Sequence, residues 1–331
     1  MKRIGVIGAG SWGTALAKLL SDNGHKVTVY SAIASEIDMM KEFHEQRDKL
    51  PGVILPDSIV FTKEMGEAVE GMDAVVLAVP SPFTRSTARS MSGCVKEGQI
   101  IVSVAKGIED GSFDTLSEII SEEIPQCRVV VLCGPTHAEE VGKGTPTAIV
   151  AGSVNKEDAE LVQDIFMSEV FRVYTSDDPY GMELGGALKN VIALAAGIAD
   201  GLGYGDNTKA ALITRGIHEI ARLGVAAGGK KETFEGLTGI GDLIVTCASM
   251  HSRNRRAGIL IGQGKTADEA MAEVSQVVEG VYSAKAAIHL ADRYNVDMPI
   301  INEVNKVLFE NKRPDEAMTD LMTRDRKAEN R

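Results

Sequence analysis

The residues whose types and spacing best suit chemistry lie in the second half of the chain, beginning with Lys189 in the run ELGGALKN. On a helix, Gly185 and Gly186 fall on the same side as this lysine, four and three residues before it. Two glycines there clear space for a groove beside the ammonium group, which can protonate or stabilise an oxyanion. A surface lysine on a helix that packs tightly through its glycines explains the same spacing, so both interpretations stay open.

An aspartate follows in the run GLTGIGDLIVT, where Asp242 stands after two glycines at an expected helix start. Thr246 lies four residues further on and therefore on the same helix face. Aspartate at a helix start is most often an N-cap that binds the free backbone N–H groups. Position alone therefore favours a capping role for Asp242.

An arginine cluster comes next, with three arginines among four residues in the run SRNRRAG (252–258). Ser252 is a plausible N-cap, which places Arg253 and Asn254 in the first helical turn. Arginine at that position opposes the helix dipole, a penalty that makes sense where an anion docks at the helix start. Arginine and free N–H groups together form a phosphate site. In an acidic chain, a solvated charged face is the alternative.

The N-terminal run IGVIGAGSWGTALAKLL supplies a second anion site of another kind. Gly8, Gly10 and Gly13 have the spacing G-x-G-x-x-G, between a short apolar strand and a stretch with helical periodicity. Such glycines permit a tight turn, a close approach to a pyrophosphate, and close packing of helix on strand. A second strand, KVTVY, follows the helical stretch. The glycines therefore lie in a strand–turn–helix–strand unit, which predicts dinucleotide binding.

These side chains need a scaffold, and the first half of the chain alternates strands with helices. The strand-like runs are continuous in Val and Ile, which indicates a largely parallel sheet covered on both faces. From Met182 onward we expect only helices, one of which begins with a capping box at Thr266 and Glu269. The sequence thus predicts an α/β fold, in which a Rossmann-type doubly wound sheet in a dinucleotide-binding domain (1–178) precedes an all-helical substrate domain (179–331). The strand-like runs are residues 4–8, 26–30, 57–61, 73–79, 99–105, 128–133, 147–152 and 171–175.

Composition narrows the possible partners. The formal net charge of −12 argues against a nucleic-acid surface, so an anionic substrate must meet local basic residues. The four cysteines form no C-x-x-C pair, which favours reduced thiols and a cytoplasmic location. The longest apolar stretch after the first strand, residues 191–199, is too short to cross a bilayer, and we expect no membrane insertion. The pattern of His, Cys and Asp suggests no metal site.

Seven motifs, in order and covering nearly the full length, together resemble bacterial NAD(P)-dependent glycerol-3-phosphate dehydrogenase. The combination of GGALKN, GDL followed by Thr246, and SRNRR is far more specific than the glycine fingerprint. The motifs are GAGSWGTALA, KGIE (106–109), GPTHAEEV (134–141), the run from 183 to 216, GLTGIGDLIVTC, SRNRRAG and VVEGV (277–281).

The resemblance implies an activity and its partners. It implies reversible reduction of dihydroxyacetone phosphate to sn-glycerol 3-phosphate, which feeds glycerophospholipid synthesis. The cofactor is then NAD(H) or NADP(H), the partner is a small-molecule phosphate substrate, no metal is required, and the protein is a homodimer.

The resemblance also implies roles for individual residues. Lys189 matches the proton donor and acceptor, and Lys106 matches a residue that touches both cofactor and substrate; together with Asp242 they form the catalytic set. The matched substrate contacts are Lys106, Gly134, Thr136, Lys189, Asn190, Asp242, Thr246, Ser252, Arg253 and Asn254. The matched cofactor contacts are Gly8, Gly10, Ser11, Trp12, Gly13, Lys106, Ala138, Arg253, Val277 and Glu279.

One departure from the family pattern concerns the choice of cofactor. The family usually carries a basic residue after the second strand to hold the 2′-phosphate of NADP, but this chain has Ala32 and Ile33. The acidic residue of an NAD enzyme is missing from that strand end as well. Arg47 and Lys49, in a later loop, are the nearest alternative charges along the chain.

Two other functions remain as alternatives. A two-domain dehydrogenase of the β-hydroxyacid type shares a nucleotide domain, a helical domain and a lysine, but acts on a carboxylate. A non-catalytic nucleotide-sensing module keeps the glycine loop but has no need for Lys189, Asp242 and Arg253 together.

Overall fold

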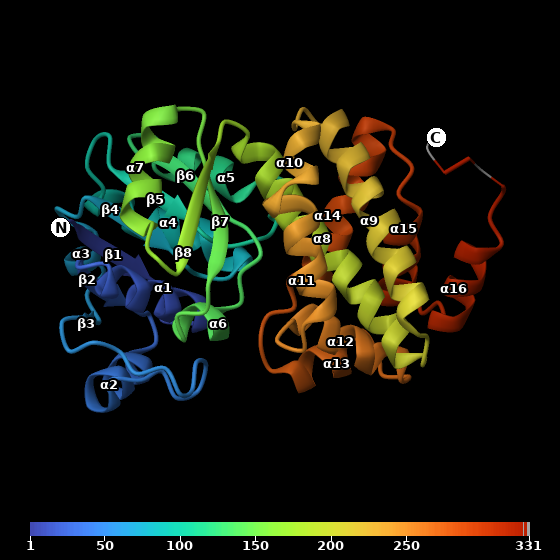
Figure 1. Cartoon of the computed structure of the whole chain (residues 1–331), viewed down its shortest axis with the longest axis horizontal. Helices are drawn as coiled ribbons and strands as arrows, with labels where there is room; N and C mark the ends of the chain where they lie inside the picture. The colour runs from blue at the N-terminus through green and yellow to red at the C-terminus, as the bar shows by residue number, and fades with distance from the viewer. Residues whose placement is uncertain (327, 330–331) are drawn as a thin grey trace.

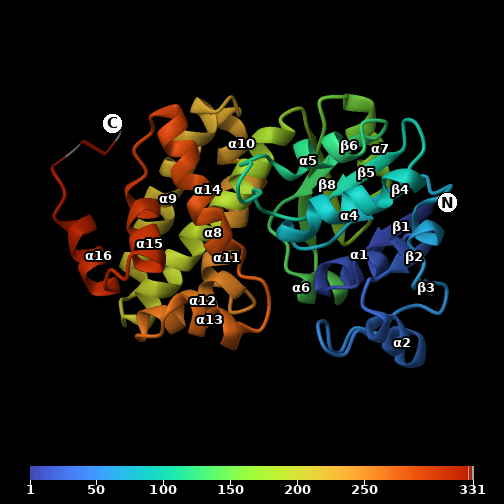
Figure 2. The same cartoon turned by 180° about the vertical axis from the view of Figure 1, so that it is seen from behind.

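The computed structural model describes residues 1–326 and 328–329, and it places two regions side by side (Figure 1). The sheet region ends with strand β8 (Phe171–Ser176), and the helical region begins with helix α8 (Pro179–Gly201). The view from behind shows the same arrangement, with helix α16 (Pro314–Met322) at the end farthest from the sheet (Figure 2).

The sheet has eight strands in the order β3-β2-β1-β4-β5-β6-β7-β8. Every neighbouring pair is parallel except β6 with β7, which confirms the predicted largely parallel sheet. Strands β2 and β3 are added on one side of β1, and the chain then crosses back to add β4 on the other side. Ligands of doubly wound sheets bind in the crevice at such a switch point, here between β1 and β4. The other strands are β1 (Arg3–Ile7), β2 (Lys26–Tyr30), β3 (Val60–Thr62), β4 (Ala74–Leu77), β5 (Ile100–Ser103), β6 (Arg128–Cys133) and β7 (Thr147–Gly152).

The continuous apolar strands are explained by burial on both sheet faces. In β4, Val76 packs in one buried cluster with Leu16 of α1, whereas Val75 packs in another with Met91 of α4. Alternate residues of one strand therefore serve two cores. The helices of this region are α1 (Ser11–Asp22), α2 (Ala34–Phe43), α3 (Met65–Val69), η1 (Ser81–Phe83), α4 (Thr84–Met91), η2 (Ser92–Cys94), α5 (Leu116–Glu123), α6 (Ala138–Gly142) and α7 (Lys156–Phe166).

Helix α8 is the core of the helical region. It is long and apolar enough to cross a bilayer, but its apolar stretch is entirely buried by other elements, as is typical of a central helix. Around it lie α9 (Asp206–Ala226), α10 (Lys231–Glu235), the π-helical turn η3 (Leu237–Gly241), α11 (Asp242–Ala248), α12 (Arg253–Gly262), α13 (Ala267–Val274), α14 (Glu279–Tyr294), α15 (Pro299–Phe309) and α16. The capping box predicted at Thr266 and Glu269 is confirmed at the start of α13.

Glycines bring α12 unusually close to α8. A Cβ atom at Gly197 of α8 would lie 2.1 Å from the carbonyl oxygen of Arg255, and one at Gly258 of α12 would lie 2.2 Å from that of Leu194. Each helix has a second such glycine four residues later, Gly201 and Gly262. The backbones therefore meet without side chains between them, which places the start of α12 beside the middle of α8.

Candidate active site

The glycine turn after β1 is shaped for a dinucleotide. Gly8 has a φ of +114°, which side-chain-bearing residues rarely adopt, and a Cβ at Gly13 would lie 2.0 Å from the carbonyl oxygen of Gly8. At Gly10, by contrast, no atom of the described residues lies within 4 Å of a Cβ, so space is open there. Ser11 and Trp12 begin α1, whose first turn carries no acidic side chain. The N–H groups of this turn suit a pyrophosphate.

Two lysines and one aspartate form a buried charge cluster where the two regions meet. Lys189 Nζ lies 2.5 Å from Asp242 Oδ1 and donates to Thr246 Oγ1 at 2.7 Å. Lys106, in the connection after β5, places its Nζ 2.7 Å from Asp242 Oδ2. The Lys189 and Asp242 residues are only 4% and 1% exposed. The predicted catalytic residues therefore converge, and Lys189 is not a surface lysine.

The prediction of a capping role for Asp242 is wrong. The π-helical turn η3 leads directly into α11, so Asp242 is the first helical residue and Gly241 takes the cap position. Its carboxylate instead binds the two ammonium groups. The glycines before Asp242 correctly indicated a helix start. Its partners Lys189 and Lys106, however, lie 53 and 136 residues away in sequence, so no local pattern could identify them.

The expected groove beside Gly185 and Gly186 is filled. A Cβ at Gly186 would lie 3.0 Å from Cys133 Sγ and 3.6 Å from Lys106 Cγ, and one at Gly185 would lie 3.0 Å from the Thr238 carbonyl oxygen. The glycines thus let the Lys106 connection, β6 and η3 pack against α8. Close packing, rather than an open groove, is what brings Lys106 to Lys189.

Burial and charge shift the pKa values of the two lysines in opposite directions. Burial lowers the pKa of Lys189 to about 8; the Asp242 carboxylate opposes the shift, and the Lys106 charge adds to it. Burial also acts on Lys106, but the Asp242 carboxylate outweighs it and raises the pKa of Lys106. A lysine with a pKa near 8 can both give and take a proton at neutral pH.

Polar groups from the sheet extend the cluster toward a substrate. Lys106 Nζ donates to the carbonyl oxygen of Gly134 at 2.8 Å and to Thr136 Oγ1 at 3.5 Å, beyond the carboxyl end of β6. Asn190 Nδ2 donates to the Lys106 carbonyl oxygen at 3.4 Å. The predicted substrate contacts on these elements therefore lie around one centre.

The start of α12 joins the same centre. Asn254 Nδ2 donates to Asn190 Oδ1 at 2.9 Å, and Asn254 Oδ1 accepts from the Gly280 N–H at 2.8 Å. Ser252 caps the helix as predicted, accepting from the Arg255 N–H at 3.2 Å. Arg253 begins the helix beside these residues.

The arginines of this cluster differ in how they are engaged. Arg255 is tied to Asp200, with Nε and Nη2 both 2.8 Å from Oδ2, and to the Ala248 carbonyl oxygen. The half-buried Arg253 guanidinium has no hydrogen bond or ion pair with another described residue. Burial lowers its pKa, against the attraction of Glu279 and Glu139. Arg256 likewise has a buried Nε without a hydrogen-bond partner among the described residues. Of these two arginines, Arg253 is the one in the first turn of α12, where an anion can also meet the free N–H groups.

Three predicted cofactor contacts lie at the rim between the regions. Glu279 begins α14, and its carboxylate accepts from both the N–H and the hydroxyl of Ser81 at the start of η1. Val277 lies just before this helix and Ala138 begins α6. The bond to Ser81 places Glu279 beyond the carboxyl end of β4, on the cofactor side of the sheet.

The end of β2 differs from the sequence-based expectation. Ser31 Oγ donates to Glu36 Oε2 at 2.6 Å, and Glu36 also accepts from Lys49. A carboxylate is therefore present beside this strand end, because the first turn of α2 folds back toward Ser31. Lys49 neutralises it, while Arg47 lies over the Phe43 ring at 3.5 Å. Ala32 and Ile33 are exposed at this strand end and carry no charge, and Lys49, bound to Glu36, is a basic side chain close to it.

Sequence reasoning missed Cys133, whose thiol is 4.0 Å from Asp242 Oδ2. Burial raises its pKa to about 11, although both lysines oppose the shift. Its place at the carboxyl end of a parallel strand was the available signal, since such ends line the ligand crevice.

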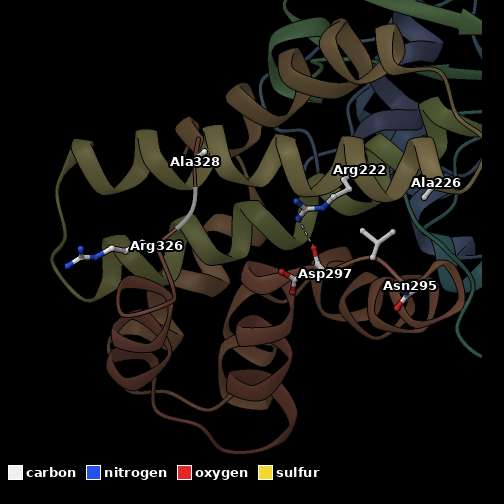
Figure 3. A pocket seen from close by; sticks show the side chains of 7 residues that line it. Arg222, Ala226, Asn295, Asp297, Arg326 and Ala328 are labelled. Carbon is white, nitrogen blue, oxygen red and sulfur yellow. Dashed lines mark hydrogen bonds between the residues drawn. The ribbon is translucent and has the colours of Figure 1, made fainter. Parts of the chain in front are cut away.

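A cavity of about 600 Å³ elsewhere is not this site. Figure 3 shows its lining residues, which come from α9, the α14–α15 connection and the C-terminal segment, and include Arg222, Asn295, Asp297 and Arg326. Arg222 donates to the Asp297 carbonyl oxygen at 2.6 Å. The lining contains none of the predicted site residues. Among the described residues, no group of three or more His, Cys, Asp or Glu side chains is arranged to hold a metal ion.

Comparison with known proteins gives one consistent result. Residues 3–159 match the model of the NAD-dependent glycerol-3-phosphate dehydrogenase N-terminus, and residues 178–319 match that of its C-terminus. A glycerol-3-phosphate dehydrogenase (NAD(P)+) from Agathobacter rectalis is 65% identical over 99% of this chain and 98% of its own length. One from Fusobacterium nucleatum is 59% identical over 99% of each.

A solved structure agrees. Glycerol-3-phosphate dehydrogenase from Coxiella burnetii superimposes with a TM-score of 0.93 at 36% identity, covering 98% of this chain and 99% of that one. Ketopantoate reductase from Ralstonia eutropha, at 15% identity and a TM-score of 0.62, shares the fold alone. The chain belongs to the NAD-dependent glycerol-3-phosphate dehydrogenase family.

Proposed function

We propose that the protein catalyses the reversible reduction of dihydroxyacetone phosphate to sn-glycerol 3-phosphate with NADH or NADPH. The observation that carries this proposal is the buried cluster of Lys189, Asp242 and Lys106 beside an unpaired arginine at a helix start. It combines a proton donor with an anion site, next to a dinucleotide turn.

Each residue of the charge cluster has its own role in the reduction. A reduced nicotinamide held at the glycine turn would supply the hydride for the ketone carbon, and negative charge would then develop on the carbonyl oxygen. Lys189 stabilises this oxygen and gives it a proton, while Asp242 holds the ammonium group in place. Lys106 adds a second positive charge beside the site.

The other predicted residues orient the two ligands. Arg253 and the N–H groups of α12 bind the phosphate. Gly134, Thr136, Asn190, Thr246, Ser252 and Asn254 supply the remaining substrate contacts. Gly8, Gly10, Ser11, Trp12, Gly13, Ala138, Val277 and Glu279 contact the cofactor, together with Lys106 and Arg253.

The proposal also covers the domain bounds, the oligomeric state and the cellular location of the enzyme. Residues 1–178 form the dinucleotide-binding domain and residues 179–331 form the substrate domain; Lys327, Asn330 and Arg331 of the latter lie outside the described residues. The protein is a cytoplasmic homodimer that supplies glycerophospholipid synthesis. Membership of the family and the buried position of α8 support a protein that works without entering the membrane.

Cofactor oxidation tests the function. We expect rapid oxidation of NADH or NADPH with dihydroxyacetone phosphate and little with hydroxy- or keto-acid substrates. Turnover of a keto acid alone would favour the β-hydroxyacid type of dehydrogenase. Cofactor binding without turnover of any of these compounds would favour the nucleotide-sensing module.

The reaction should depend on pH through Lys189. Reduction requires the protonated ammonium, so kcat/KM for dihydroxyacetone phosphate is expected to be constant below pH 8 and to fall above it, because the pKa of Lys189 is about 8. Oxidation of glycerol 3-phosphate requires the neutral amine and should rise over the same range. Because the Lys106 charge lowers the pKa of Lys189, Lys106→Ala should move both midpoints upward. Profiles that run in parallel in the two directions would contradict this assignment.

Discrimination between the two cofactors should be weak. Ala32 and Ile33 cannot pair with a 2′-phosphate, and the Glu36 carboxylate near the strand end is neutralised by Lys49. We expect kcat/KM for NADH and NADPH to differ by less than about tenfold, or about 1.4 kcal/mol. Ala32→Arg should shift the preference toward NADPH through a charge-assisted contact, whereas Ala32→Gln should not. A wild-type preference for NADPH of about a hundredfold would instead assign the clamp to Lys49.

A further inference from the structure

The connection between β5 and α5 belongs to the sheet region by sequence but packs into the helical region. We call residues 106–117 the arm; it begins with Lys106 and ends with Ser117 in the first turn of α5. Ile108 is only 2% exposed and is buried in the apolar cluster of the helical region, with Leu184 and Leu188 of α8. The lysine of the charge cluster is thus attached to a segment that the other region holds.

An aromatic contact fixes the tip of the arm. The Phe113 ring stacks on the His289 ring of α14, with centroids 3.8 Å apart and planes 11° from parallel. Phe113 has a φ of +64°, a conformation that costs free energy in a residue with a side chain. The stack therefore holds a backbone conformation that the arm would not adopt for local reasons.

Helix α8 holds both ends of the arm. At the far end, the fully buried Glu183 accepts from the N–H of Ser117 at 2.9 Å and from its hydroxyl. At the near end, Asn190 Nδ2 donates to the Lys106 carbonyl oxygen. Burial raises the pKa of Glu183 to about 7, whereas the hydrogen bonds from Ser117 act to lower it. Burying this carboxyl group costs free energy unless it is hydrogen-bonded, and the arm supplies its bonds through Ser117.

The arm can transmit these contacts because it is internally bonded. Ile108 and Thr115 form an antiparallel bridge, the Glu109 N–H donates to the Asp114 carbonyl oxygen at 3.0 Å, and the Phe113 N–H donates to that of Glu109 at 3.2 Å. On the side facing the sheet region, Arg85 of α4 pairs with the Glu109 carboxylate. A displacement of the tip or of the far end therefore moves the whole arm, including Lys106.

We propose that Phe113 and Glu183 are positioning residues that hold Lys106 against Asp242 through the arm. Neither touches the cluster itself; each acts by fixing the segment that carries the lysine. The inference rests on the proposed function, because it assumes that Lys106 assists turnover. A shift of about 1 Å in a positioned group can cost about a hundredfold in rate.

The test is a double-mutant cycle in the full chain with dihydroxyacetone phosphate and NADH. Phe113→Ala and Glu183→Gln are each made in the wild type and in Lys106→Ala. In the wild type we expect kcat to fall by about tenfold or more. We also expect the pH midpoint of kcat/KM to move upward as the Lys106 charge moves away from Lys189. In the Lys106→Ala background we expect neither change to lower kcat further. Phe113→Tyr should restore the wild-type values.

Tyr174→Ala is the matched control, since this partly exposed ring lies on the edge strand β8 and contacts Arg172, outside the arm and the helices that hold it. It should leave kcat and the pH midpoint unchanged. Equal losses from Phe113→Ala and Glu183→Gln in both backgrounds, or losses with no shift of the pH midpoint, would overturn the positioning role and indicate general destabilisation. Normal turnover of Lys106→Ala alone would instead overturn the catalytic role of Lys106, and the positioning role with it. If Phe113→Ala does not fold, Glu183→Gln and Phe113→Leu decide the question.

Discussion

Replacing Lys189 with alanine should lower kcat for dihydroxyacetone phosphate reduction by about 10²–10⁴-fold or more. The ammonium acts on charge that appears only in the transition state, so its loss affects turnover and not the binding of the cofactor. NADH affinity should stay close to that of the wild type, because the glycine turn lies on a different element.

The structure also predicts that this variant folds. Asp242 keeps its ion pair with Lys106 when Lys189 is removed, so the buried carboxylate retains a partner. Steady-state kinetics, NADH titration and a thermal melt together measure the effect. Lys230→Ala is the control, since this lysine pairs with Asp177 at the surface and should leave turnover unchanged. Near-normal turnover by folded Lys189→Ala would remove the lysine from the proposed mechanism.

Replacing Arg253 with alanine should weaken the use of the phosphorylated substrate selectively. A charge-assisted hydrogen bond contributes about 1.5–3 kcal/mol, so kcat/KM for dihydroxyacetone phosphate should fall by about 10- to 100-fold for each bond lost. The weak activity on unphosphorylated dihydroxyacetone should barely change, because that substrate has no phosphate to bind. Kinetics with both substrates measure the difference.

Arg255→Ala provides the contrast within the same cluster. It removes the ion pair with Asp200 and the bond to the Ala248 carbonyl oxygen, so its expected effect is a lower Tm with no selectivity between the two substrates. An equal loss on both substrates in Arg253→Ala would contradict phosphate binding by Arg253 and leave it only a cofactor contact or a role in folding.

The sequence by itself was enough to predict what depends on local patterns. The eight strands followed from continuous Val and Ile runs, and the turn after β1 from its glycines. The helix starts at Ser252 and Thr266 followed from capping residues. A positive φ and a satisfied N-cap are each imposed by neighbours within a few residues, so one-dimensional spacing carries them. Burial on both sheet faces is imposed by distant helices, but it leaves a local mark in the sequence as a continuous apolar run.

Only the tertiary structure decided which charged groups meet. Spacing indicated an N-cap at Asp242, yet helix packing makes this carboxylate the partner of two lysines. The spacing and the resemblance singled out Arg253, and the structure adds the reason that Arg255 does not share its role, because Asp200 engages Arg255 in an ion pair. These outcomes depend on glycines that bring α8 and α12 into backbone contact and on an arm that crosses between regions. Pairing of side chains from distant parts of the chain follows from the packing of whole elements, which no local pattern encodes.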